Sequence, residues 1–537
     1  MCGFIVIEGE FDSSQSSSVL GPFKNLYNKL THRGPDDHKV VAFKKGVIGF
    51  HRLAIMDLSP LGAQPFSTSS GNMLVCNGEI YNYPELKTKC TNHQFISHSD
   101  CEVLLPLYEM WGMEKMVQSL DAEYALVIWD EKKGKLLAAR DPMGIRPLFY
   151  GKTKEGKIAF ASEVKALVDV CSEITPFPPG HYYDGEKLIS YLDLSKVESF
   201  HALSTPEVLK GINSRLREGV RKRLQSDAEI GFLLSGGLDS SLVCAIAQEM
   251  SSKPIRTFSI GMTDDAIDSK YAKDVADYIG ANHTNVTMTV ADVLGALRQV
   301  VYHLETWDIT TVRASIGMYL VCKHIGEKTN IKVLLSGEVS DELFGYKYTD
   351  FAPSPEEFQK EAAKRIHELY IYDVLRADRC ISAHSLEARV PFSDKDFVQF
   401  VMGIDPKLKM NSTGMGKFLL REAFKAGDGE KKLLPDHILW RDKAAFSDAV
   451  GHSMVDELKA YAEKQYTDED VKNAYKKYPY KTPFTKESLL YREIFEEFYP
   501  GRAHLIKDYW MPNQTWENCK VTDPSARVLP NYGASGK

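Results

Sequence analysis

Residues 230–241 read Ile-Gly-Phe-Leu-Leu-Ser-Gly-Gly-Leu-Asp-Ser-Ser. The apolar run at 232–234 predicts a buried strand of a parallel sheet, and apolar residues at 242–247 predict a helix just after it. A strand that turns directly into a helix leaves backbone N–H groups unpaired at the positive end of the helix dipole. The glycines allow close approach of an anion and the serines add hydroxyl groups, which predicts a phosphate-binding loop made by Ser235, Gly236, Gly237, Ser240 and Ser241. A simple turn rich in glycine and serine is the alternative.

The loop is not of the Walker type, because no Gly-Lys-Ser/Thr follows it. Asp239 lies in the loop instead, and a carboxylate beside phosphates implies a bridging Mg²⁺ ion. A loop with Mg²⁺ and no lysine suits the binding of pyrophosphate as a leaving group. The pattern Ser-Gly-Gly-x-Asp-Ser at 235–240 resembles the pyrophosphate-binding loop (PP-loop) of adenylating ATP-pyrophosphatases.

Length and composition indicate an ordinary globular protein. The 537 residues are enough for two or more domains, and 43% of them are hydrophobic and 26% charged. A formal charge of −7 gives no electrostatic reason to expect nucleic-acid or membrane binding. The one basic cluster, at 215–223, alternates with apolar residues at helical spacing, which favours the solvated face of an amphipathic helix.

Cysteine usage and hydropathy bear on the compartment. The nine cysteines form no C-x-x-C pair and no zinc spacing, which is typical of reduced thiols in a reducing compartment. We see no signal-peptide pattern and no apolar run of membrane-spanning length. We therefore expect a cytoplasmic protein.

Cys2 would become the first residue if Met1 were removed. A free α-amine has a pKa near 8, so it could take the proton of its own thiol and make Cys2 both nucleophile and base. On its own, a cysteine at this position would be an ordinary buried thiol. The rest of the N-terminal half has short strand-like runs, for example at 124–129, 135–139 and 158–161, and few helices. This pattern predicts two stacked sheets flanked by helices.

Together with several other segments of the N-terminal half, Cys2 resembles the class II glutamine amidotransferase domain. That domain is an α+β N-terminal-nucleophile (Ntn) hydrolase with an αββα sandwich. The likeness rests on His32–Asp36, Phe50–Ile55, Asn77–Asn82, Ser99–Glu102 and Arg140–Leu148 and runs to about Tyr191. It implies that Cys2 attacks the glutamine amide while the Asn77 side chain and the Gly78 N–H hold the oxyanion. Loss of one such donor typically lowers the rate of catalysis by on the order of 10²–10³. It also implies a glutamine site made by Arg52, Leu53, Ala54, Ile55, Met56, Asn77, Gly78, Glu79 and Asp100. Arg52 suits the α-carboxylate of glutamine, and the two acids suit its α-ammonium group. When each is considered alone, Asn77-Gly78 could instead form a hairpin turn, and Arg52 could be an ordinary charged residue on the surface.

The C-terminal half alternates strands and helices, which predicts a doubly wound α/β sheet that binds its ligand at the carboxyl ends of the strands. Predicted strands lie at 257–261 and 332–336, with helices at 270–280 and 293–304 and a mostly helical stretch from about residue 356. A second strand-end loop, Ser336-Gly337-Glu338-Val339-Ser340-Asp341-Glu342, carries three acids. It is either a solvated turn or a site for a cation and a nucleophile, and its pairing with the first loop favours the site.

Together the two halves resemble the glutamine-hydrolysing asparagine synthetase family over nearly the whole chain. The resemblance extends to Tyr509–Pro512 and Asp523–Arg527. It implies that ATP adenylates aspartate, and that ammonia from the first domain attacks β-aspartyl-AMP after passing an internal tunnel. Glu338 would be the base for ammonia, and Asp239 and Asp341 the Mg²⁺ ligands. The ATP site would be Leu233, Ser235, Gly236, Gly237, Asp239, Ser240, Ile260, Ser336, Gly337 and Lys443. The aspartate site would be Thr310, Arg313, Glu342 and Arg389.

We expect a glutaminase domain at 1–195, a synthetase domain at 206–527 and a mobile tail at 528–537. The chain departs from the family at Val339, where glycine is usual, at Ala444, where glutamate is usual, and at Ser385 and Ser393, where Gly and Leu are common. A β-branched residue does not readily adopt the positive φ that glycine allows, so Val339 is expected to reshape its loop.

Two other functions stay open. One is an amidotransferase of the same build that acts on another carboxylate, such as a β-lactam-forming relative. The other is a degraded synthetase with a structural or regulatory role. Glutamine, aspartate and ATP are the expected partners; the sequence gives no oligomeric state, although the family is often dimeric.

Overall fold

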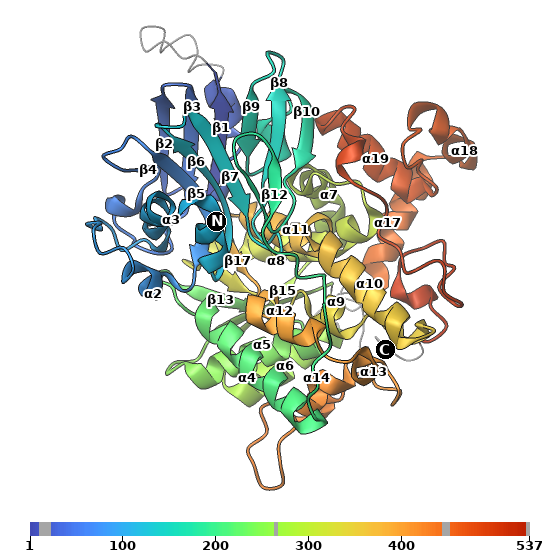
Figure 1. Cartoon of the computed structure of the whole chain (residues 1–537). Helices are drawn as coiled ribbons and strands as arrows, with labels where there is room; N and C mark the ends of the chain where they lie inside the picture. Colours follow the sequence, from blue (N-terminus) through green and yellow to red (C-terminus); the bar gives the residue numbers. More distant parts are fainter. Residues whose placement is uncertain (10–22, 263–266, 443–451, 533–537) are drawn as a thin grey trace.

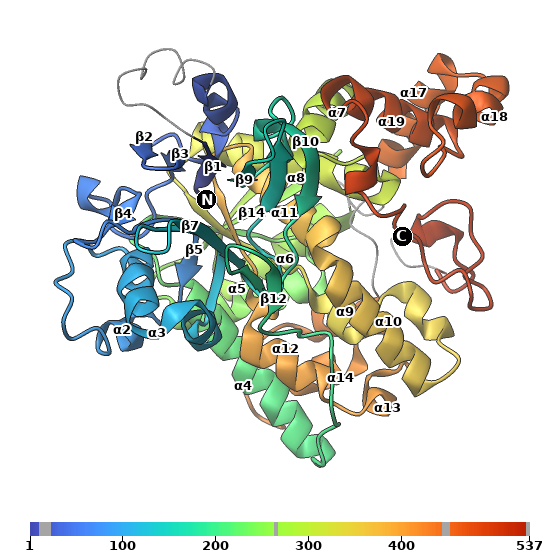
Figure 2. The same ribbon diagram turned by 45° about the horizontal axis from the view of Figure 1, so that its top comes forward.

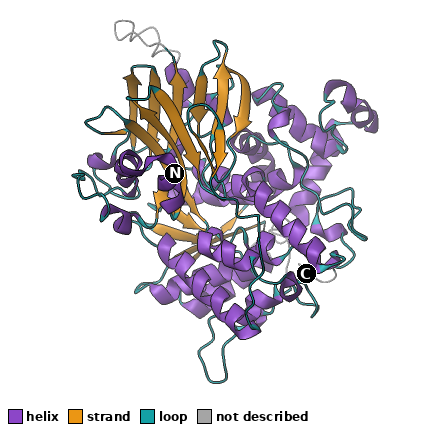
Figure 3. Cartoon of the chain, viewed as in Figure 1, coloured by secondary structure: helices purple, strands orange, loops and turns teal. Residues whose placement is uncertain are grey.

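The computed structural model describes residues 1–9, 23–262, 267–442 and 452–532. Two stacked sheets lie in the N-terminal part and a smaller sheet lies below them among helices (Figures 1 and 3). Strand β12 ends at Ser190 and α4 begins at Thr205, so the two parts meet in the intervening loop. No helix in the described ranges is long and apolar enough to cross a membrane.

The N-terminal part is a sandwich of two six-stranded antiparallel sheets. The first has the order β10-β8-β9-β1-β3-β2, and the second β12-β11-β7-β6-β5-β4. The strands are β1 (Gly3–Glu8), β2 (Asp37–Phe43), β3 (Gly46–Arg52), β4 (Phe66–Ser67), β5 (Met73–Ile80), β6 (Ala122–Asp130), β7 (Lys135–Arg140), β8 (Phe149–Thr153), β9 (Ile158–Ala161), β10 (Cys171–Pro176), β11 (His181–Tyr183) and β12 (Leu188–Ser190).

Alternation along these strands makes the sandwich core. Phe4 and Val6 of β1 and Val75 and Val127 of the second sheet meet in one buried cluster between the sheets. On the outer face of the second sheet lies α3 (Leu104–Ser119), and its apolar residues pack on the strands in a separate cluster. The predicted helix-flanked sandwich is thereby confirmed.

The second part has a five-stranded parallel sheet of order β15-β14-β13-β16-β17. Its strands are β13 (Ile230–Leu233), β14 (Arg256–Gly261), β15 (Asn282–Thr287), β16 (Val333–Leu335) and β17 (Glu387–Arg389). The chain winds outward in one direction from β13 and in the other from β16, which makes the boundary between these two strands the topological switch point. The doubly wound fold predicted from the sequence is confirmed.

Helices cover both faces of this sheet, so its strands are buried on both sides. Phe232 and Leu335 join one buried cluster with α4, α5, α6 and α12, while Ile260 and Leu334 join another with α7, α8 and α11. The helices of the second part are α4 (Thr205–Arg223), α5 (Leu238–Met250), α6 (Ile267–Ile279), α7 (Val290–Leu304), α8 (Ile309–Lys328), α9 (Ser340–Phe344), α10 (Pro355–Glu368), α11 (Asp373–Ser382), α12 (Lys395–Met402), α13 (Pro406–Lys409), α14 (Phe418–Ala423), α15 (Asp436–Leu439), α17 (His452–Gln465), α18 (Asp468–Lys477) and α19 (Lys486–Phe498). Figures 1 and 2 show α17, α18 and α19 as a helical group at one side of the molecule.

The two parts share a continuous core and a buried network of charges. Ile5 and Ala161 of the first sheet belong to the same cluster as Val300 and Trp307 of the second part. Arg33 of the first part makes a two-pronged ion pair with Asp378 of α11, with distances of 2.9 and 3.1 Å. The relative placement of the two parts is therefore fixed by packing and by buried ion pairs.

Residues 528–532 are the described part of the predicted mobile tail. Leu529 and Tyr532 are buried, at 5% and 8% exposure, whereas Val528 is 45% exposed. The mobility of the tail stays a prediction. Residues 533–537 lie outside the described ranges.

Candidate active sites

The loop between β13 and α5 has the form predicted from its sequence. Gly236 takes a positive φ of 71°, and a Cβ there would lie 2.5 Å from the backbone nitrogen of Ala272. Gly237 is the N-cap of α5, and the hydroxyl groups of Ser235 and Ser240 lie 2.9 Å apart across the loop. The loop therefore directs the N-terminus of a 13-residue helix toward the switch point of the sheet.

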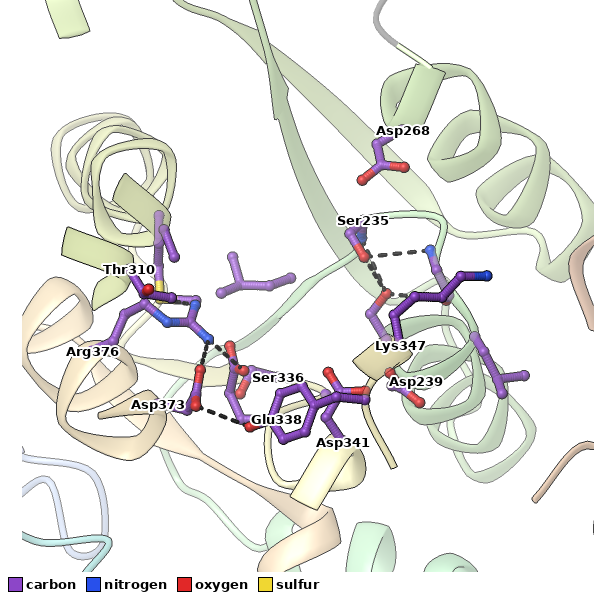
Figure 4. Close-up of a pocket in the computed structure, with 18 of the residues that line it drawn as sticks. Ser235, Asp239, Asp268, Thr310, Ser336, Glu338, Asp341, Lys347, Asp373 and Arg376 are labelled. Atoms are coloured by element: carbon purple, nitrogen blue, oxygen red, sulfur yellow. Dashed lines mark hydrogen bonds and ion pairs between the residues drawn. The ribbon is translucent and has the colours of Figure 1, made fainter. Parts of the chain in front are cut away.

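The acidic loop at 336–342 contacts the loop between β13 and α5. It follows β16, the neighbour of β13, and a Cβ on Gly337 would lie 2.7 Å from the backbone nitrogen of Ser240. Both loops line one cavity of about 290 Å³ (Figure 4). Of the predicted residues, the cavity is lined by Leu233, Ser235, Gly237, Asp239, Ser240, Ile260, Thr310, Arg313, Ser336, Gly337, Glu338 and Asp341.

Lys417 lies between the two carboxylates that were predicted to hold Mg²⁺. Its Nζ is 2.7 Å from Asp239 Oδ2 and 2.7 Å from Asp341 Oδ1, and its side chain is 3% exposed. A cation thus fits between these carboxylates, and oxygen ligands of this kind suit Mg²⁺ shared with substrate phosphates. Sequence reasoning missed Lys417, whose only local signal is its place before the apolar run of α14.

Glu338 has a cationic partner that the sequence did not indicate. Arg376 of α11 lies 2.8 Å from Glu338 Oε2 and 3.1 Å from Asp373 Oδ1. Burial raises the pKa of Glu338, and the Arg376 guanidinium opposes that rise. Figure 4 shows Arg376, Asp373 and Glu338 together at one end of the cavity, away from Ser235.

Three predicted residues within the described ranges do not line this cavity. Arg389 is fully buried at the junction of the two parts, where it pairs with Glu79 at 3.1 Å and Glu387 at 2.9 Å. Glu342 is buried and accepts a hydrogen bond of 2.6 Å from Tyr346. Gly236 is packed against Tyr271 and Ala272. Lys443 lies outside the described residues, as does Ala444.

Both arginines that were predicted to bind aspartate have protein partners in the structure. Arg313 does line the cavity, but its guanidinium is paired with Glu487 of α19 and, at 2.8 Å, with Asp523. Arg389 is directed by strand β17 toward the first domain instead. Sequence order could not show these partners, because Asp523 and Glu79 are each far from the arginine in the chain.

Cys2 lies at the start of β1 and is half-buried. Its Sγ is 3.8 Å from the backbone oxygen of Leu53, and Arg33 Nε donates a 2.9 Å hydrogen bond to its backbone oxygen. With Met1 in place, burial raises the pKa of the Cys2 thiol to about 11. Burial also lowers the pKa of the Met1 amine to about 6, although Glu387 lies 3.7 Å away.

Asn77 is fully buried inside β5, and neither Oδ1 nor Nδ2 has a partner among the described residues. A buried amide without a partner calls for a ligand, since its desolvation is otherwise uncompensated. At the next residue, Gly78, a Cβ would lie 2.5 Å from the backbone oxygen of Glu123. The alternative of a hairpin turn at Asn77-Gly78 is wrong, because both residues lie within an eight-residue strand.

Charged residues expected around glutamine are buried here. Arg52 donates to the backbone oxygens of Ser59, at 2.7 Å, and Asp57, so the alternative of a surface charge is wrong. Asp100 accepts a 2.6 Å hydrogen bond from the Ile80 N–H, and burial raises its pKa to about 6. Burial also raises the pKa of Glu79.

The segment that follows Arg52, residues 53–56, is also largely buried. Leu53, Ala54 and Ile55 are buried and Met56 is half-buried. The Ala54 N–H donates to Asp36 at 2.8 Å, which fixes the loop beside Cys2.

Comparison with known proteins identifies the family of both parts of the chain. Residues 1–198 match the family model described as "Glutamine amidotransferase domain", and residues 211–356 and 350–523 match the one described as "Asparagine synthase". A probable glutamine-hydrolysing asparagine synthetase of Acanthamoeba polyphaga mimivirus is 42% identical over 94% of this chain and 96% of its own length. The glutamine-hydrolysing asparagine synthetases of Cricetulus griseus and Homo sapiens are 40% and 39% identical over 100% of both chains. The chain belongs to the family of glutamine-hydrolysing asparagine synthetases.

Proposed function

We propose that this chain synthesises asparagine from aspartate, with glutamine as the nitrogen source and ATP as the energy source. After removal of Met1, the α-amine of Cys2 takes the thiol proton, and the sulfur attacks the side-chain amide of glutamine. The Asn77 side chain and the Gly78 N–H hold the oxyanion, and Arg52 holds the α-carboxylate. The C–N bond then breaks, and ammonia leaves with the proton that the α-amine had taken up. Water hydrolyses the resulting thioester and releases glutamate, and the ammonia moves to the second site.

At the second site the β-carboxylate of aspartate attacks the α-phosphate of ATP. The loop at 235–240 binds the departing pyrophosphate at the N-terminus of α5. Asp239 and Asp341 hold Mg²⁺, which neutralises phosphate charge when it is bound. Glu338, whose pKa is raised by burial, takes a proton from the ammonia that attacks β-aspartyl-AMP.

One observation carries the second half of the proposal. The loops at 235–240 and 336–342 lie in contact at the switch point of the sheet. Asp239 and Asp341 both pair with the ammonium group of Lys417. Two loops that touch in this way can share one pyrophosphate and its cation.

Product analysis tests the proposal. We expect the full chain, given glutamine, aspartate and MgATP, to form asparagine, glutamate, AMP and pyrophosphate. Formation of ADP and phosphate would reject the adenylation step. Pyrophosphate release with other carboxylic acids, but not with aspartate, would instead support the β-lactam-forming type of relative.

A further inference from the structure

The C-terminal segment, residues 523–532, forms part of the cavity in which the two strand-end loops meet. Pro524, Ser525, Leu529 and Tyr532 all line that cavity. This segment thus lies close to the predicted adenylation site, although it is about 190 residues from the loop at 336–342.

Ion pairs anchor the beginning of the segment. Asp523 is paired with Arg313 Nη1 at 2.8 Å and with Lys459 Nζ at 2.6 Å. Arg313 belongs to α8, whose Thr310 and Ala314 also line the cavity. Arg313 is 4% exposed and also contacts Glu487, so it is committed to protein partners. Through its ion pair with Asp523, Arg313 holds the C-terminal segment beside the cavity.

Apolar packing and a hydrogen bond anchor the other end. Leu529 belongs to a buried cluster with Tyr348, Trp510 and Trp516. The side-chain amide of Asn531 donates to the backbone oxygen of Lys347 at 2.8 Å and to Asp350 at 3.1 Å. Both partners lie just after the acidic loop and α9. The segment is therefore fastened on the two sides of the cavity, with apolar side chains between the fastenings.

We infer that the C-terminal segment shields the acyl-adenylate from water and so decides between ammonia and water as the attacking group. This inference rests on the proposed function. In the productive reaction, nitrogen bonds to the carbonyl carbon and the C–O bond to AMP breaks. In the wasteful one, a water oxygen bonds to that carbon, AMP leaves with the electron pair, and aspartate and a proton are released. Excluding water from the cavity suppresses the second reaction.

Two variants of the full chain test the shield. Leu529→Ala opens the apolar wall, and Asp523→Asn weakens the anchor to Arg313 and Lys459. Val528→Ala is the matched control, because Val528 is the neighbouring residue, is 45% exposed and does not line the cavity. Each protein receives aspartate, MgATP and saturating ammonia in H₂¹⁸O, and AMP, asparagine and ¹⁸O in the β-carboxylate of aspartate are measured.

We expect the ratio of AMP to asparagine to rise by about threefold or more in both test variants, with matching ¹⁸O in aspartate, and to stay at the wild-type value in Val528→Ala. An unchanged ratio in Leu529→Ala and Asp523→Asn, with both products reduced in parallel, would overturn the shield and leave the proposed function standing. Failure of the wild-type chain to release AMP with aspartate would instead reject the proposed function, and the shield with it.

Discussion

The region around Cys2 and the cavity around Asp239 differ in how their buried polar groups are satisfied. In the first region, the fully buried Asn77 amide has no hydrogen-bond partner among the described residues. In the second, Asp239 and Asp341 are paired with Lys417, and Glu338 with Arg376. A glutamine can enter the first site without displacing a protein contact to Asn77, whereas ATP and its cation must exchange contacts in the second. We therefore expect the Asn77 amide to bind a ligand without a change of protein partners, and the carboxylates of the second site to exchange ion pairs on binding.

Replacement of Cys2 separates the two regions most sharply. We expect Cys2→Ala to reduce glutamine-dependent synthesis by about 10³-fold or more, because no other group can form the acyl intermediate. Asparagine formation with ammonia should persist, and side-by-side assays with the two nitrogen donors measure this. Loss of both activities would show that the sites are not separable.

Asn77 tests whether the open amide is an oxyanion donor. We expect Asn77→Ala to lower kcat for glutamine hydrolysis by about 10²–10³-fold, as for loss of one oxyanion donor. Thermal unfolding should change little, since the side chain makes no hydrogen bond to another described residue. A strongly lowered Tm with near-normal hydrolysis would assign Asn77 a structural role instead.

Replacement of Arg376 tests whether its ion pair with Glu338 controls the pKa of that carboxyl group. Its guanidinium opposes the rise in the pKa of Glu338, so Arg376→Met should raise that pKa further. Because Glu338 acts as a base only when it is ionised, the acid limb of ammonia-dependent synthesis should move to higher pH. The profile is measured at constant free ammonia, with Arg376→Lys as the charge-preserving control. An unmoved acid limb in Arg376→Met would remove Glu338 from the role of base.

Asp378 tests the connection between the regions. Arg33 binds both Asp378 and the backbone oxygen of Cys2, so the synthetase domain helps to position the nucleophile. We expect Asp378→Asn to cost about 1–3 kcal/mol of stability and to lower glutamine hydrolysis more than ammonia-dependent synthesis. Equal loss of the two activities would contradict a positioning role through Arg33.

Val339 is expected to show the smallest effect. It takes a glycine-like φ of 77° and is 2% exposed, so it adopts a backbone conformation that glycine would also allow. In Val339→Gly, relief of backbone strain of about 1–3 kcal/mol offsets the loss of about 1.5–3 kcal/mol from a buried side chain. Activity within about twofold of wild type is expected for a working enzyme. A sharp rise, alone or with Ala444→Glu, would favour a degraded synthetase.

Much of the fold and of both sites was accessible from local patterns. Apolar runs followed by Ser235-Gly236-Gly237 and Ser336-Gly337 located two parallel strands and their loops, because strand and turn preferences depend on neighbouring residues. Ser385 also takes a positive φ, of 58°, where the family commonly has glycine.

Partners that are distant in the chain were decided only by the tertiary structure. Nothing near Lys417 in sequence indicates that its ammonium lies between Asp239 and Asp341, and nothing near Arg313 indicates Asp523. The sheet order brings β17 beside β16 and turns Arg389 toward Glu79, away from the cavity where it was expected. Local sequence thus determined the strands, the glycine bends and the nucleophile, since these depend on residues within a few positions. Which charges neutralise one another was decided by long-range packing, because a buried charge takes whichever partner the fold brings within reach.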